Sequence, residues 1–155
     1  LAVSLSTFAI PIGASKCFPI QHLCNVIAGV FLGPGYGVAM AFCTSLIRNL
    51  IGTGSPLAFP GSMVGAFLCG FLYQHTGKLA AAYFGEVFGT GIIGGLLCYP
   101  VATLLMGQEA ALFAYVIPFL ISTAGGTVMA MILVGALYQS GAMSYLKGVL
   151  GGTAR

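Results

Sequence analysis

The chain has 155 residues, of which 59% are hydrophobic and only 5% are charged, with a net charge of +3. Soluble domains carry about a quarter charged residues, so this composition excludes a soluble enzyme domain and predicts a protein embedded in lipid. Five basic residues are too few to form a surface that binds a nucleic-acid backbone. A membrane helix needs about 20 apolar residues, so the chain has room for about six spans in one domain over residues 1–155.

Gly, Pro and the rare charged residues divide the chain into six apolar segments. In chain order these are residues 1–12, 20–32, 38–51, 59–73, 79–106 and 110–138. The first is interpreted as the remainder of a first helix that is incomplete at its N-terminal side. Pro100 is expected to bend or end the fifth segment, and Pro118 to kink the sixth. We therefore expect an all-α polytopic membrane protein with six transmembrane helices.

Small residues recur four positions apart in several of these segments. The pairs are Gly29 and Gly33, Gly61 and Gly65, Gly85 and Gly89, and Gly91 and Gly95. This spacing lets helix backbones approach closely, and we interpret it as packing inside the bundle. The five cysteines form no CxxC pair, which favours free, buried thiols over a zinc or redox site.

The basic residues give a prediction for orientation. With six spans, both termini lie on one side of the membrane, together with Lys78, Lys147 and Arg155. The other side holds Lys16 and Arg48. Because basic residues concentrate on the cytoplasmic side, the sequence predicts cytoplasmic termini in a multi-pass protein of the plasma membrane.

Polar residues gather at the segment ends opposite the termini, whereas the other half of each segment is mostly apolar. They are Lys16, Gln21, His22, Asn25, Arg48, Asn49, Thr53, Ser55, Ser62, Tyr99, Tyr115, Ser122 and Thr123. Polar groups are costly in lipid unless they are satisfied, so we expect these side chains to face one another or a ligand. Polar residues confined to one half predict an outward-facing cup, because a channel needs polar lining through both leaflets.

Three positions have both a structural and a binding interpretation. Glu86 lies inside the fifth segment, where a carboxylate needs a partner; it could accept a hydrogen bond from a ligand or pair with Arg48. Arg48 could hold an anionic or hydroxyl group, or extend to the membrane interface. His22 lies three residues before Asn25 on one helix face, and both could bind a ligand or pack internally.

The sequence has no catalytic constellation. The GxSxG, HExxH and Walker motifs do not occur, and the only acidic residues are Glu86 and Glu109. We expect no enzymatic activity and no ATP hydrolysis in this chain, so uphill transport would take its energy from a partner. The alternatives from other classes are a stand-alone channel or facilitator, and a membrane enzyme that uses Glu86 and His22.

Five stretches resemble motifs of ThiW-type proteins. They are residues 10–26 (IPIGASKCFPIQHLCNV), 48–54 (RNLIGTG), 59–63 (FPGSM), 85–91 (GEVFGTG) and 118–122 (PFLIS). The resemblance implies a six-helix substrate-binding subunit, or S component, of an energy-coupling factor transporter. It also implies a transmembrane coupling subunit and two ATPase subunits as partners. The ligand that it implies is hydroxyethylthiazole, the thiazole precursor of thiamine.

The candidate ligand-binding residues all carry polar groups that could face the cup. They are Gln21, His22, Asn25, Arg48, Asn49, Glu86, Thr90, Tyr115 and Ser122. S components usually dock through an Ala-xxx-Ala pattern on the first helix, whose nearest match here is Ala2 and Ser6. We expect no cofactor in this chain, and ATP is used by the partner ATPases. Because Arg48 suits a phosphorylated ligand, the ligand's charge stays open, and the pyrimidine precursor and thiamine itself are alternatives.

Overall fold

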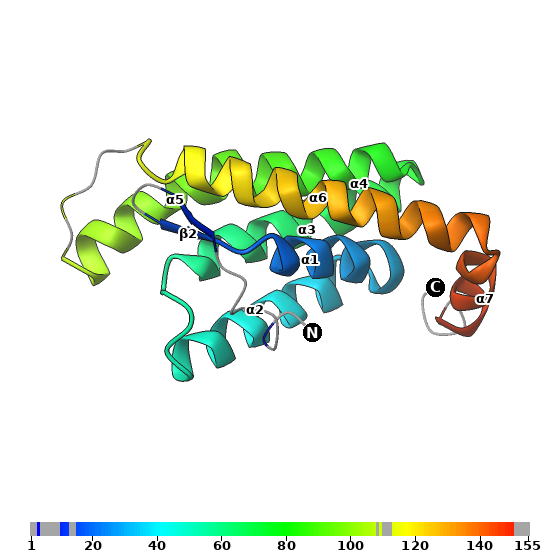
Figure 1. The fold of residues 1–155 in the computed structure, drawn as a ribbon, viewed down its shortest axis with the longest axis horizontal. Helices are drawn as coiled ribbons and strands as arrows, with labels where there is room; N and C mark the ends of the chain where they lie inside the picture. The colour runs from blue at the N-terminus through cyan, green and yellow to red at the C-terminus, as the bar shows by residue number, and fades with distance from the viewer. Residues whose placement is uncertain (1–2, 4–9, 13–14, 108, 110–112, 151–155) are drawn as a thin grey trace.

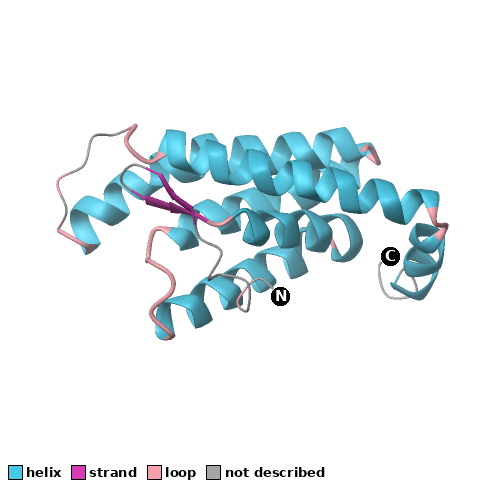
Figure 2. Ribbon diagram, viewed as in Figure 1, coloured by secondary structure: helices cyan, strands magenta, loops and turns pink. Residues whose placement is uncertain are grey.

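The computed structural model describes Val3, residues 10–12, 15–107, 109 and 113–150. Its elements are β1 (Ile10–Ile12), β2 (Ser15–Cys17), α1 (Pro19–Leu32), α2 (Pro34–Leu50), α3 (Ala58–Thr76), α4 (Leu79–Glu86), η1 (Val87–Gly94), α5 (Gly95–Pro100), η2 (Val101–Leu105), α6 (Val116–Gln139) and α7 (Ala142–Leu150). The helices form an elongated bundle (Figure 1). The antiparallel strands β1 and β2 form a short hairpin at one end (Figure 2). Helix α3 packs against α1, α2, α4 and η1, and α6 packs against α1 and η1.

Three helical segments are long and apolar enough to cross a membrane: Pro19–Leu50, Leu79–Leu105 and Val116–Gln139. They support a helical membrane protein, but six spans are not confirmed. The first segment holds two helices, because α1 ends at Gly33, whose positive φ of 86° starts the turn into α2. Ile10–Ile12, within the predicted first span, form strand β1 instead of helix. Ala2 and Ser6 lie outside the described residues.

The two prolines of the long segments have different positions in their helices. The helix does not end at Pro100 but continues as the π-helix η2, so of the two predicted effects only a bend remains. Pro118 lies in the first turn of α6, where backbone N–H groups have no partner within the helix. Pro118 therefore lies at the start of a helix and does not kink its interior, contrary to the prediction.

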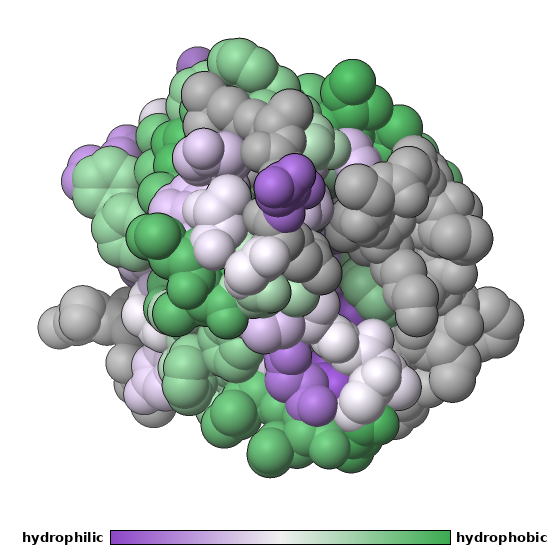
Figure 3. Space-filling view, turned by 90° about the vertical axis from the view of Figure 1, so that its left-hand side faces the viewer, coloured by the Kyte–Doolittle hydropathy of each residue, from purple (hydrophilic) through white to green (hydrophobic). Residues whose placement is uncertain are grey.

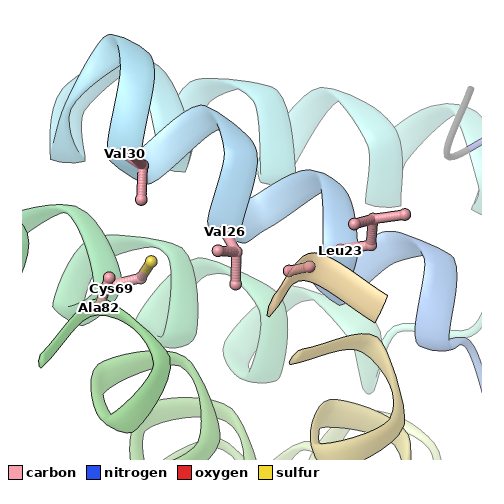
Figure 4. Packing of buried hydrophobic residues seen from close by; sticks show 6 residues of the cluster. Leu23, Val26, Val30, Cys69 and Ala82 are labelled. Carbon is pink, nitrogen blue, oxygen red and sulfur yellow. The ribbon is translucent and has the colours of Figure 1, made fainter. Parts of the chain in front are cut away.

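The half of the bundle away from the hairpin is held by apolar packing. Its buried residues are Leu23, Val26, Val30, Cys69, Ala82 and Ala130, five of which Figure 4 labels. Close helix contacts at glycine surround this core: a Cβ on Gly85 would lie 2.7 Å from the Leu68 carbonyl oxygen, and one on Gly89 would lie 3.0 Å from the Cα of Gly65. The prediction that these glycines pack inside the bundle is confirmed. Four of the cysteines are free thiols, as predicted: Cys24, Cys43, Cys69 and Cys98. Cys69 and Cys98 are also buried as predicted, whereas Cys24 is partly buried and Cys43 is exposed.

Candidate binding site

Buried polar side chains meet where α1, α3 and α6 begin and α2 ends. We call them the polar cluster: Gln21, His22, Asn25, Ser45, Arg48, Ser62, Glu86, Thr90 and Ser122. Seen from the end of the bundle that faces left in Figure 1, hydrophilic and neutral residues are interspersed with hydrophobic ones on the described surface (Figure 3). The prediction that polar residues from separate segments come together is confirmed for this cluster.

Glu86 is the centre of one half of the polar cluster. Its side chain is 0% exposed, and three groups contact its Oε1 atom: His22 Nδ1 at 2.9 Å, Asn25 Nδ2 at 3.0 Å and Thr90 Oγ1 at 3.2 Å. The Asn25 amide also donates to the Ser62 carbonyl at 3.2 Å. Because a carbonyl only accepts, this bond fixes the orientation of the amide and makes Oε1 an acceptor. The side chain that contacts Glu86 in place of the predicted Arg48 is His22.

The change of helix type at Glu86 positions this carboxylate. Glu86 ends α4, and the π-helix η1 begins at the next residue. π-Helical turns leave a carbonyl without its usual partner, and here the Glu86 carbonyl accepts a hydrogen bond from Thr123 Oγ1 at 3.3 Å. On the facing helix, Gly65 leaves the space that the Thr90 and Glu86 side chains fill, since a Cβ at Gly65 would lie 1.9 Å from Thr90 Oγ1.

Arg48 is the centre of the other half of the polar cluster. It is 1% exposed, and its Nη1 donates to Gln21 Oε1. The guanidinium carbon lies 3.5 Å from the centroid of the Phe18 ring, a cation–π contact. Arg48 Nε and Nη2 are buried without a hydrogen-bond partner among the described residues.

A hydrogen-bonded chain joins the two halves of the polar cluster. Gln21 Nε2 donates to Ser45 Oγ at 3.2 Å, and Ser45 Oγ lies 3.1 Å from Ser62 Oγ. The Ser62 carbonyl then accepts from Asn25, which donates to Glu86. The residues from four helices thus form one connected network between Glu86 and Arg48.

A cavity of about 30 Å³ lies at the Arg48 side of this network. Its lining consists of Phe18, Gln21, His22, Arg48, Ser55, Ala58, Ser62, Phe119 and Ser122. The structure thus places four predicted site residues in the lining: Gln21, His22, Arg48 and Ser122. Ser122 Oγ accepts a 2.8 Å hydrogen bond from the backbone N–H of Phe18, which ties the start of α1 to α6.

The other predicted site residues lie outside the cavity lining. Asn25, Glu86 and Thr90 form a layer behind His22. Asn49 Nδ2 donates to the carbonyls of Ser45 at 2.8 Å and Ser55 at 3.1 Å, and so holds the loop after α2. Tyr115 packs in a separate apolar cluster with Leu57, Cys98 and Ala102.

The aromatic part of the lining did not enter the sequence prediction. Phe18 and Phe119 carry no polar group, so a search for polar residues passes over them, although each lies beside a proline in a ThiW-like stretch. Their rings give the cavity apolar walls. A cavity with apolar walls and a few fixed polar groups is typical of sites for small organic molecules.

Comparison with known protein families identifies the chain's similarity to one of them. A family model described as thiamine-precursor transporter protein (ThiW) matches residues 1–140. Neither a curated protein nor a solved structure matches the chain.

Proposed function

Since the chain belongs to the ThiW family of thiamine-precursor transporter proteins, we propose that it is the substrate-binding subunit of an energy-coupling factor transporter. Its ligand in this proposal is the thiazole precursor of thiamine, hydroxyethylthiazole or a derivative. The observation that carries the proposal is the family match over residues 1–140. The connected polar cluster beside a cavity supports it.

The chemistry of the cavity suits a small heteroaromatic ring. Phe18, Phe119 and Ala58 offer apolar surface to the ring, while His22, Arg48 and Ser122 offer hydrogen bonds to its substituents. Ligand sites usually enclose about 300–1,000 Å³, so the cavity of about 30 Å³ has to widen. In this proposal the cavity widens by displacement of Phe18. Phe18 directly follows the hairpin, and a single hydrogen bond from its backbone N–H connects it to Ser122.

Binding to the purified protein in detergent tests the ligand. Titration calorimetry and thermal melting with hydroxyethylthiazole, hydroxymethylpyrimidine and thiamine separate the proposal from its nearest alternatives. We expect the thiazoles to bind most tightly. Tighter binding of the pyrimidine or of thiamine would reassign the substrate, and no binding of any thiamine precursor would contradict the proposed function.

Transport tests the role as a subunit. In the proposal, the chain lies in the plasma membrane with cytoplasmic termini and works with a transmembrane coupling subunit and two ATPases, which hydrolyse the ATP. We expect uptake of labelled thiazole by cells or liposomes only when these partners are present with ATP. Flux through liposomes that contain this chain alone would favour the stand-alone channel or facilitator.

A further inference from the structure

Arg48 is a buried cation that forms no ion pair with either acidic side chain, Glu86 or Glu109, among the residues that the structure describes. The sequence holds only two acidic residues. Glu86 pairs with His22 and accepts from Asn25 and Thr90, while Glu109 is exposed. Among the described residues, Arg48 therefore forms no ion pair.

The groups that do contact Arg48 are neutral. Gln21 accepts one hydrogen bond from it, and the Phe18 ring covers one face of the guanidinium. Arg48 also lies in the last turn of α2, where the partial negative charge of the helix end stabilises a cation. None of these contacts uses Nε or Nη2, and a buried charge with unpaired donors destabilises a protein unless another group compensates it.

The two unpaired atoms share one edge of the guanidinium. Nε and Nη2 point their N–H bonds in the same direction, the arrangement that binds a carboxylate or phosphate through two parallel hydrogen bonds. Arg48 lines the cavity together with Ser122. The Ser122 hydroxyl accepts from the Phe18 backbone N–H and so belongs to the same wall. Arg48 Nε and Nη2 are the buried donors that have no partner among the described residues, and they are available to an anion.

We infer that the ligand carries an oxyanion group, a carboxylate or a phosphate monoester, and that Arg48 binds it side-on through Nε and Nη2. The inference rests on the proposed function for the ring: the substrate is then an anionic thiazole, and not neutral hydroxyethylthiazole. The ring packs between Phe18 and Phe119, and the anion replaces the missing counter-charge of Arg48.

Paired ligands that differ in charge test this inference on the wild-type protein. The probes are hydroxyethylthiazole, its phosphate ester, and the analogue in which an acetate group replaces the hydroxyethyl group. We expect at least one anionic probe to bind about 10- to 100-fold more tightly than the neutral one, the range for hydrogen bonds to a charged group. Which anion binds tighter distinguishes the carboxylate from the phosphate.

Two variants test whether Arg48 causes the tighter binding of anionic ligands. Arg48→Gln should abolish the preference for the anion, and Arg48→Lys should keep part of it, since a lysine retains the charge but lacks the two-pronged edge. Lys78→Gln is the matched control, because it removes an exposed cation outside the polar cluster and should leave the preference unchanged. If the Arg48 variants do not fold, the wild-type comparison decides alone.

The outcomes separate this inference from the proposed function. Equal or tighter binding of neutral hydroxyethylthiazole overturns the inference and leaves the function standing. A preference for the anion that persists in Arg48→Gln also overturns it. If no thiazole binds but a phosphorylated pyrimidine precursor does, and Arg48→Gln abolishes that binding, the thiazole assignment fails and the inference stands. If none of these compounds binds, both fail.

Discussion

The two halves of helix α1 differ in the side chains that they bury. Its first half carries Gln21, His22 and Asn25 into the polar cluster, whereas its second half carries Val26 and Val30 into the apolar core, which Leu23 joins from the first half. Helices α3 and α6 divide in the same way, with Ser62 and Ser122 near the hairpin and Cys69 and Ala130 in the core. The apolar half holds the helices together, and the polar half is available to hold a ligand.

The polar and apolar halves of the bundle also differ in how many of their buried polar atoms lack a hydrogen-bond partner. Of the buried polar atoms without partners, all but Thr127 Oγ1 belong to the polar cluster: Asn25 Oδ1, Arg48 Nε, Arg48 Nη2 and Glu86 Oε2. Each unpaired buried group costs about 1–3 kcal/mol. Proteins keep such groups mainly at functional sites and compensate for them elsewhere, so this difference supports the proposal that the polar half binds the ligand.

The largest effect on affinity is expected for Glu86→Gln. Three groups contact Glu86 Oε1, and hydrogen bonds to a neutral amide are weaker than those to a carboxylate. The hydrogen bond that orients His22 at the cavity wall then weakens. Ligand affinity should therefore fall about 10- to 100-fold. Calorimetry measures it, with Glu109→Gln as the matched control because Glu109 is the other acid and is exposed. Equal affinities of the two variants would remove Glu86 from the site.

An intermediate effect is expected for Gly65→Ala. The new Cβ would lie 1.9 Å from Thr90 Oγ1 and 3.0 Å from Glu86 Oε2, so both side chains have to move. Overpacking of this kind destabilises by about 1–3 kcal/mol, and affinity should fall about tenfold because the Glu86 network shifts. Gly135→Ala is the control, since nothing lies within 4 Å of its Cβ. Wild-type affinity in Gly65→Ala would show that the network tolerates displacement.

A smaller effect on affinity is expected for Asn49→Ala. The substitution removes the hydrogen bonds to the Ser45 and Ser55 carbonyls and should destabilise the protein by about 1–3 kcal/mol. Asn49 does not line the cavity, although Ser55 does, so affinity should fall only about twofold. Thermal melting and calorimetry measure the two changes. A loss of affinity as large as that of Glu86→Gln would place Asn49 in the site.

The smallest effect on affinity is expected for Val30→Ala. Val30 is buried in the apolar half with Cys69 and Ala82, and removing its two methyl groups should lower the free energy of unfolding by about 1–3 kcal/mol. The polar-cluster residues of α1 lie about one and a half to two and a half turns toward the start of the helix, so ligand affinity should stay at the wild-type value. A clear loss of affinity in the folded variant would mean that the two halves are not separable.

Much of the division between the halves could be predicted from the sequence. The small residues spaced four apart indicated where helices approach, and the one-sided polar residues indicated a cluster. Both patterns follow from helical periodicity and the cost of burying polar groups, which do not depend on the details of packing. The bounds of α1 also agree with the apolar segment predicted over residues 20–32.

The pairings inside the site could not be predicted. Whether Glu86 faces His22 or Arg48 depends on the rotation of the helix around it, and the π-helix η1 that follows Glu86 departs from the 3.6-residue period. Tyr115 and Asn49 have the polar groups of site residues. Contacts distant in the sequence place Tyr115 in an apolar cluster, whereas Asn49 binds carbonyls close to it in the sequence, in α2 and the loop after it. Phe18 contacts Arg48 at the cavity, and no sequence pattern indicated this contact.

A structure of the protein with a bound thiazole precursor tests the central claim most directly. We expect the ring between Phe18 and Phe119, with its substituent within hydrogen-bonding distance of Arg48. The alternative location is the outer apolar groove lined by Val38, Met63, Val64, Phe67, Leu68 and Ile93. A ligand bound in that groove or in the apolar half, with the polar cluster unchanged, would contradict the assignment of binding to the polar half.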